Sequence, residues 1–119
     1  MESMQIMPAI QDVEAYQRVI AQERATVLLF SADWCSDCRY LDTYIEEIVT
    51  SYSAQFDFYS VDRDEQIDLC QSLDVLGIPS FVVYQSGKEI ARFVNGKRKF
   101  KPEVVEFLDL ALQQLEVRN

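Results

Sequence analysis

The chain has 119 residues, a length that suits one domain with one hydrophobic core, and 49% of its residues are hydrophobic. Its formal net charge is −9 and it contains no histidine, which disfavours nucleic-acid binding because proteins of that class present a basic surface. No apolar run is long enough to cross a bilayer, and no basic signal-peptide region begins the chain. We therefore expect a monomeric single domain over residues 1–119 in a reducing cytoplasm, bound to neither nucleic acid nor membrane.

Strand and helix signals alternate in the first half of the chain. Residues 4–7 are expected to form a short edge strand, and apolar residues at helical spacing predict a helix over residues 10–23. The continuous apolar run at residues 27–32 is typical of a strand in the middle of a sheet. The pattern then predicts one long helix over residues 35–53 and a strand over residues 56–61.

The second half of the chain continues with a short helix, a hairpin and a final helix. The short helix is expected over residues 62–72, and the strands 80–85 and 89–94 flank the turn signal at residues 86–87. Pro102 suits the first position of the last helix, which carries an apolar stripe. The order predicts an α/β fold with a central mixed sheet of four to five strands, flanked by helices on both faces.

Two cysteines stand two residues apart, between the predicted central strand and the long helix. Cys35 lies at the expected helix start and Cys38 one turn later. Unpaired backbone N–H groups and the positive end of the helix dipole favour a thiolate on the first sulfur. We expect that sulfur to be exposed to attack and the second one to reach back and close the disulfide. The pattern predicts a redox dithiol, with Cys35 as the nucleophile and Cys38 as the resolving thiol.

A metal site is the competing interpretation of the same two cysteines. Zinc takes four ligands, typically Cys or His, whereas this chain has no His and one further cysteine, Cys70. A zinc site within one chain is therefore disfavoured, and an iron–sulfur cluster shared between two copies is a remote alternative. We expect no metal. Cys70 falls on the apolar side of its predicted helix, which favours a buried structural thiol over a regulatory one.

Four features of the chain follow one known pattern. They are an apolar strand that ends at Trp34, the motif Cys35-Ser36-Asp37-Cys38, the segment Gly77-Ile78-Pro79-Ser80 and the hairpin over residues 81–94. In this order they resemble the thioredoxin family over most of the chain. The resemblance implies a thioredoxin fold, a reversible Cys35–Cys38 disulfide without a bound cofactor, and Pro79 as a cis-proline beside the cysteines.

The chain departs from the thioredoxin pattern in the strands that flank the site. The family carries a buried Asp in the strand before the motif, where this chain has Leu29, and a Lys in the next strand, where it has Phe58. The resemblance implies that the missing Asp is the proton acceptor for Cys38. Deprotonation of Cys38 would then use water or Asp37, so we expect the resolving step to be slow and strongly pH-dependent.

A second departure lies between the two cysteines, where Ser36-Asp37 replaces the usual Gly-Pro. The Asp37 carboxylate opposes thiolate formation on Cys35, and the cation of Arg39 offsets part of that effect. Since about 30 mV corresponds to 1.4 kcal/mol for a two-electron couple, modest electrostatic changes move the potential. We therefore predict that Asp37, Ser36 and Arg39 tune the redox potential.

The substrate is expected to meet two segments around the dithiol. Trp34 would lie over the site as a flat contact surface, and Gly77, Ile78 and Pro79 would form the other half of that surface, by resemblance to the family. The basic cluster within residues 97–101 is interpreted as a solvated turn, with steering of an acidic partner as a lesser alternative.

These observations predict a thiol–disulfide oxidoreductase that reduces protein disulfides and serves electron transport and cell redox homeostasis. By resemblance, a separate thioredoxin reductase would supply its electrons from NADPH. One alternative is a specialised reductant of a low-molecular-weight disulfide or of a dedicated peroxidase. The other is a non-catalytic binding or chaperone-like module built on the same fold.

Overall fold

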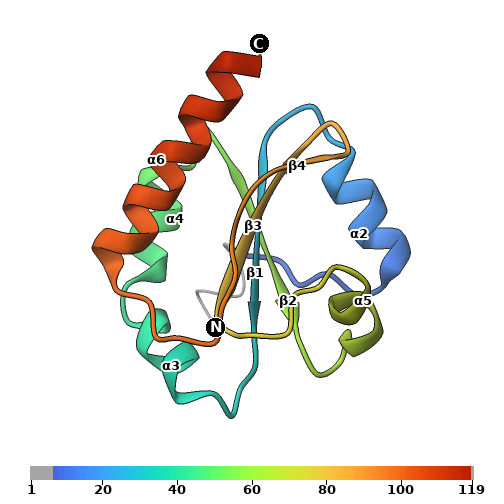
Figure 1. Cartoon of the computed structure of the whole chain (residues 1–119), viewed down its shortest axis with the longest axis vertical. Helices are drawn as coiled ribbons and strands as arrows, with labels where there is room; N and C mark the ends of the chain where they lie inside the picture. The colour runs from blue at the N-terminus through green and yellow to red at the C-terminus, as the bar shows by residue number, and fades with distance from the viewer. Residues whose placement is uncertain (1–6, 119) are drawn as a thin grey trace.

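A computed structural model describes residues 7–118, in which a four-stranded mixed sheet lies between two layers of helices (Figure 1). The elements are α2 (Val13–Ile20), β1 (Thr26–Ser31), α3 (Ser36–Asp42), α4 (Ile45–Ser51), β2 (Asp57–Asp62), α5 (Ile67–Ser72), β3 (Ser80–Gln85), β4 (Lys88–Phe93) and α6 (Lys101–Arg118). The strand order is β2-β1-β3-β4, with β1 parallel to β2 and the other pairs antiparallel. The predicted α/β fold with a mixed sheet is confirmed.

The central strand β1 explains why helices cover both faces of the sheet. Val27 and Leu29 point into a core shared with α4 and α6, whereas Leu28 and Phe30 point into a second core shared with α2 and α5. Successive side chains of a strand alternate between faces, so a continuously apolar strand needs cover on both. Figure 1 shows α3, α4 and α6 on one side of the sheet and α2 with α5 on the other.

The predicted long helix over residues 35–53 is wrong, because it breaks into α3 and α4 at residues 43–44. The Thr43 hydroxyl donates a hydrogen bond of 2.7 Å to the carbonyl of Tyr40, which competes with regular helix geometry. Tyr44 leaves the helical conformation at φ −133°, and its hydroxyl donates to the carbonyl of Lys99 at 2.6 Å. A contact with a segment far along the chain therefore sets this break.

Two other helices begin later than expected, because in each case an aspartate carboxylate accepts hydrogen bonds from backbone amides near the helix start. Asp12 accepts a 2.8 Å hydrogen bond from the Ala15 amide, so α2 begins at Val13. The Asp62 carboxylate accepts from the backbone amides of residues 64 and 65, and α5 begins only at Ile67.

The predictions for the first strand and the last helix can be compared with the structure only in part. The edge strand predicted at residues 4–7 lies, apart from Met7, outside the described residues. The last helix, α6, begins at Lys101, one residue before Pro102. Within residues 7–118, no helix combines the length and apolar character needed to span a bilayer.

Candidate active site

The dithiol lies where β1 ends and α3 begins. Cys35 is the N-cap of α3, with φ −85° and ψ 114°, and its Sγ accepts a hydrogen bond of 3.2 Å from the Cys38 amide. This hydrogen bond holds the Cys35 sulfur at the first turn of α3, next to Cys38. Cys35 and Cys38 are both free thiols.

The two sulfurs differ in burial. Cys35 is 7% exposed and Cys38 is 1% exposed, so the expected order is present but the prediction of a freely exposed first sulfur is wrong. Burial raises the pKa of the Cys38 thiol to about 12, and hydrogen bonding to Cys35 acts in the same direction. Cys38 is therefore held as a thiol and must lose its proton before it can attack.

The charges around the motif are paired differently from what the sequence suggests. Arg39 donates to the carboxylate of Asp42 at 2.9 Å and to the carbonyls of residues 32 and 33, so it fastens the turn before Cys35 to α3. Asp37 is instead paired with Arg98, whose Nε lies 2.9 Å from its Oδ1. Arg98, which the sequence placed only in the basic cluster of residues 97–101, is thus the cation directly opposite Asp37. The exposed Ser36 lies beside this pair, and redox tuning by these residues stays a prediction.

Leu29 and Phe58 are both buried in the hydrophobic core between the sheet and the α4–α6 layer. Apolar packing therefore occupies both positions where the family resemblance implies a buried acid and a lysine. A surface hollow reaches Leu29, and Ala32, Arg39 and Asp42 also line it. Position 29 is therefore filled by core packing and holds no group that could accept a proton.

The third cysteine stands apart from the dithiol chemistry. Cys70 is fully buried on α5, and burial raises the pKa of its thiol to about 11. Both observations fit a structural thiol. Over the part of the chain that the structure describes, no three metal-ligating side chains gather into a site.

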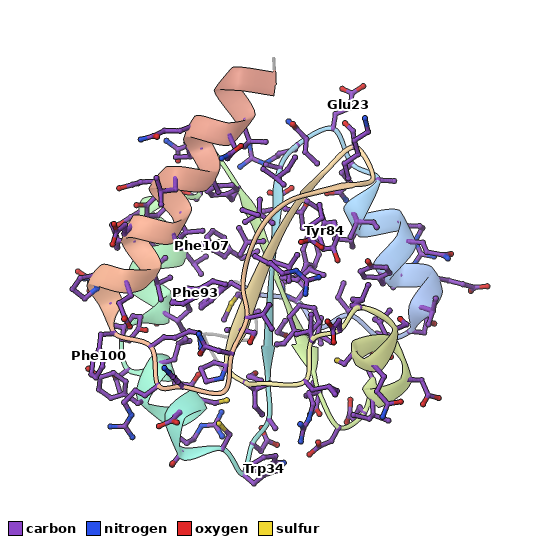
Figure 2. All side chains as sticks on the ribbon, in the orientation of Figure 1. Glu23, Trp34, Tyr84, Phe93, Phe100 and Phe107 are labelled. Carbon is purple, nitrogen blue, oxygen red and sulfur yellow. The ribbon has the colours of Figure 1, made fainter. Side chains whose placement is uncertain are left out.

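Trp34 is 65% exposed and lies at the tip of the molecule beside α3 (Figure 2). Its indole nitrogen donates to Asp64, and the guanidinium of Arg63 lies 5.5 Å from its ring centroid. Hydrogen bonding from Trp34, followed by that from Arg63, holds the pKa of Asp64 below its ordinary value. Sequence reasoning missed Asp64 and Arg63, although they directly follow β2, which is parallel to β1 and ends at the same edge.

The second predicted half of the substrate surface is mostly buried. The Ile78–Pro79 peptide bond is cis, as the resemblance implies, but the side chain of Ile78 packs in the core and Pro79 is buried. Gly77 stands against the next loop, where an added Cβ would lie 2.5 Å from the carbonyl carbon of Asn95. The hydroxyl of Ser80 donates to the Gly77 carbonyl at 2.6 Å and holds this turn. A substrate-binding role of the turn stays a prediction.

The basic cluster after β4 is not a uniformly solvated turn. Lys97 and Arg98 are exposed, but Lys99 is 1% exposed and its ammonium nitrogen donates to backbone carbonyls of the same loop. The interpretation of this cluster as a solvated turn is therefore wrong for Lys99. No sequence signal separates it from its neighbours, since the loop itself supplies its partners.

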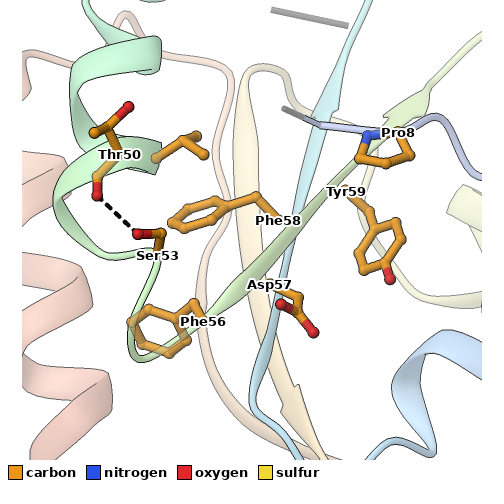
Figure 3. Close-up of a pocket in the computed structure, with 8 residues that line it drawn as sticks. Pro8, Thr50, Ser53, Phe56, Asp57, Phe58 and Tyr59 are labelled. Atoms are coloured by element: carbon orange, nitrogen blue, oxygen red, sulfur yellow. Dashed lines mark hydrogen bonds between the residues drawn. The ribbon is translucent and has the colours of Figure 1, made fainter. Parts of the chain in front are cut away.

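A separate groove lies between α4 and β2 (Figure 3). Phe56, Phe58 and Pro8 give it an apolar lining, and Ser53 at its rim donates to the Thr50 carbonyl at 3.0 Å. Its one carboxylate, on Asp57, is paired with Arg24 at 2.8 Å. Neither cysteine of the dithiol lines this groove.

Comparison with known proteins agrees with this geometry. The thioredoxin family model matches residues 7–109. Thioredoxin-1 of Saccharomyces cerevisiae is 35% identical over 80 residues, which cover 67% of this chain and 77% of the yeast protein. Thioredoxin of Rattus norvegicus is 29% identical over 101 residues, which cover 82% of this chain and 95% of the rat protein. The solved thioredoxin of Trypanosoma brucei brucei shares the fold, with a TM-score of 0.76, 21% identity and coverage of 95% and 92% of the two chains.

The matched region contains the complete dithiol site. It includes the strand β1, the cysteine pair and the cis bond before Pro79. Proteins of this family cycle between a dithiol and a disulfide without a bound cofactor, and the free Cys35 and Cys38 supply that pair here. The chain therefore belongs to the thioredoxin family and is a thiol–disulfide oxidoreductase.

Proposed function

We propose that the chain reduces disulfides in other proteins, with Cys35 as the attacking thiol and Cys38 as the resolving thiol. The observation that carries this assignment is the difference between the two sulfurs. Cys35 caps α3 next to the exposed Trp34, whereas Cys38 lies buried behind it with a raised pKa. The less buried Cys35 attacks first, and the more deeply buried Cys38 acts inside the mixed disulfide.

Two exchange steps complete the reaction. The Cys35 thiolate attacks one sulfur of the substrate disulfide, so that the substrate S–S bond breaks and a mixed disulfide forms. Cys38 then loses its proton and attacks the Cys35 sulfur, which releases the second substrate sulfur as a thiolate. Two electrons pass to the substrate, and the two protons of the dithiol balance the two new substrate thiols.

Electrons return to the oxidised protein from NADPH through a separate thioredoxin reductase, in the cytoplasm. Support for the reductase comes from the family, whose members are in general reduced by such an enzyme. Fractionation of cells that express the chain from its own gene tests the compartment. Recovery with a mitochondrial marker instead of a cytoplasmic one would overturn that part of the proposal.

Insulin reduction tests the function directly. We expect NADPH-driven turnover with thioredoxin reductase from the same organism, complete loss in Cys35→Ser, and retained turnover in the control Cys70→Ser. Turnover on a small disulfide or a peroxidase but not on insulin would indicate the specialised reductant instead. An unchanged cellular phenotype when Cys35 and Cys38 are both replaced by Ser would indicate a binding or chaperone-like module.

A further inference from the structure

Lys99 is a buried lysine without a carboxylate partner in the described part of the chain. Its Nζ donates three hydrogen bonds, to the backbone and side-chain oxygens of Asn95 at 3.2 and 2.9 Å and to the carbonyl of Lys97 at 2.8 Å. It also lies 5.1 Å from the ring centroid of Phe93. Burial of a charge is costly unless an opposite charge compensates it, so the location of the nearest anions matters.

The three oxygen acceptors define the charge state of Lys99. An ammonium has three N–H donors and a neutral amine has two, so only the charged form can donate to all three oxygens at once. Burial lowers the pKa of Lys99, and negative charge nearby raises it again. Those negative groups are Glu103 on α6 and, around α3, Cys38, Asp37 and Cys35. Two of the four are the sulfurs of the dithiol, which carry charge only when they are thiolates.

Three successive residues, 98–100, fasten this ammonium to the helix that carries Cys38. They contact α3 and the residue before α4, and Figure 2 shows Phe100 beside these helices. The contacts are Arg98 to Asp37 at 2.9 Å, the Lys99 carbonyl to the Tyr44 hydroxyl at 2.6 Å, and the ring of Phe100 to that of Tyr40 at 5.6 Å between centroids. These contacts hold the backbone on both sides of Lys99 against α3 and the start of α4.

We propose that Lys99 is a positioning residue of the disulfide exchange, whose buried ammonium is the counter-ion of the dithiol when it becomes a thiolate. This inference rests on the dithiol relay proposed above. Arg39 is a second cation that lowers the pKa of Cys38. In addition to it, the Lys99 charge favours the Cys35 thiolate that attacks the substrate and the transient Cys38 thiolate that resolves the mixed disulfide. It acts in a chain where Leu29 leaves no buried carboxylate to take the proton from Cys38.

Burial gives this charge more influence than the exposed charges of the same loop. Two charges interact several times more strongly inside a protein than in water, and salt screens buried charges much less. Lys97 carries the same charge two residues away but is exposed. Replacement of either lysine removes one positive charge from the loop, so Lys97 provides a matched control.

The test compares Lys99→Met with Lys97→Met in the full-length reduced protein. Alkylation of Cys35 by iodoacetamide across pH reports the thiolate, and equilibration with glutathione reports the reduction potential. For Lys99→Met we expect the midpoint of the alkylation profile to rise by roughly one pH unit and alkylation at neutral pH to slow about tenfold. The potential becomes more negative because the reduced thiolate loses its counter-ion, whereas Lys97→Met behaves like the unmodified protein.

Several outcomes decide the proposal. A folded Lys99→Met with the alkylation midpoint and potential of Lys97→Met would overturn it. If Lys99→Met does not fold, Lys99→Arg and Lys99→Gln are compared, and a midpoint that rises only in Lys99→Gln supports the role of the charge. Because alkylation and potential need no protein substrate, failure to reduce insulin would leave this inference intact and reject only the proposed function.

The unmodified protein gives an independent measurement. Coupling between two titrating groups is reciprocal, so Lys99 must hold its proton more tightly when the thiolate is present. NMR titration of the Lys99 ammonium should therefore show a lower pKa in the disulfide form than in the reduced form. Equal pKa values in the two redox states would contradict the proposal without any substitution.

Discussion

The segment that carries the dithiol, residues 32–39, and the segment that packs against it, residues 95–100, are held by different kinds of contact. In the first, Cys35 donates its amide to the carbonyl of Ala32 at 3.3 Å, and its own carbonyl accepts from Arg39 at 3.0 Å. These backbone partners lie within about one turn of chain, whereas the side chains of Trp34 and Asp37 reach the distant Asp64 and Arg98. The second segment is held mainly by distant elements, since its residues contact the cis-proline turn, α3 and the start of α4.

The two segments also differ in what their charges can do. Around Trp34, the partners Arg63 and Asp64 are solvent-accessible, and exposed pairs of this kind contribute little and are screened by salt. In the second segment, Lys99 carries its charge inside the protein. The segment of residues 32–39 positions the two sulfurs. The segment of residues 95–100 places the buried charge of Lys99 near them.

The largest effect is expected in the pH dependence of the resolving step. Because burial raises the pKa of Cys38 to about 12, its thiolate fraction grows about tenfold per pH unit from neutral pH upward. Resolution of a mixed disulfide on Cys35 should rise with the same slope. Stopped-flow fluorescence of Trp34, the single tryptophan, measures it. A resolution rate that reaches a plateau near neutral pH would contradict the prediction that Cys38 has no buried proton acceptor.

A carboxylate placed at position 29 sharpens this test. Leu29→Asp should flatten the pH profile of resolution, since a buried base can take the proton of Cys38. It should also lower the free energy of unfolding by about 2–4 kcal/mol because a charged group replaces core packing. Leu29→Asn is the control, since it carries a similar polar group that cannot act as the base and should keep the steep profile.

Gly77→Ala breaks the contact between the cis-proline turn and the second segment. The added Cβ would lie 2.5 Å from the carbonyl carbon of Asn95 and 2.6 Å from the amide nitrogen of Gly96, both backbone atoms. We expect the free energy of unfolding to fall by about 1–3 kcal/mol and insulin turnover to fall with it. Gly96→Ala, whose Cβ meets its nearest atom at 4.0 Å, should change urea unfolding far less. Equal losses in both variants would mean that the close approach is unimportant.

Tyr44→Phe tests the attachment of the second segment to the helix break. It removes the hydroxyl that donates to the Lys99 carbonyl at 2.6 Å, which should cost about 1 kcal/mol of unfolding free energy. Tyr52→Phe is the matched control, because its hydroxyl donates to the exposed Asp109. If both substitutions shift urea unfolding equally, the Tyr44 contact has no special role.

Most of the sheet could be predicted because its signals are local. The continuous apolar runs of β1 and β3 and the turn at residues 86–87 place those strands to within a residue. The break between α3 and α4 could not be predicted in the same way, because it depends on Tyr44 reaching Lys99, 55 residues later. Periodicity alone reads this stretch as one helix.

The same distinction applies to the site. Cys35 and Cys38 are evident from their spacing, and Pro79 from its resemblance to a known pattern. Lys99 is not evident, because its partners are carbonyl oxygens of its own loop and not a complementary side chain. Arg98 was missed for a different reason, since its pairing with Asp37 depends on how two distant segments pack.

The smallest effect is expected from the exposed pair that joins the two segments. Asp37→Asn removes the carboxylate that opposes the Cys35 thiolate, so the alkylation midpoint should fall, opposite in direction to Lys99→Met and smaller in size. Arg98→Gln leaves the carboxylate without its cation, and its midpoint should rise slightly. Both shifts should fade as salt is added, because the pair is partly exposed. A shift in Asp37→Asn that survives high salt and exceeds that of Lys99→Met would reverse the comparison, and the exposed pair would then control the dithiol.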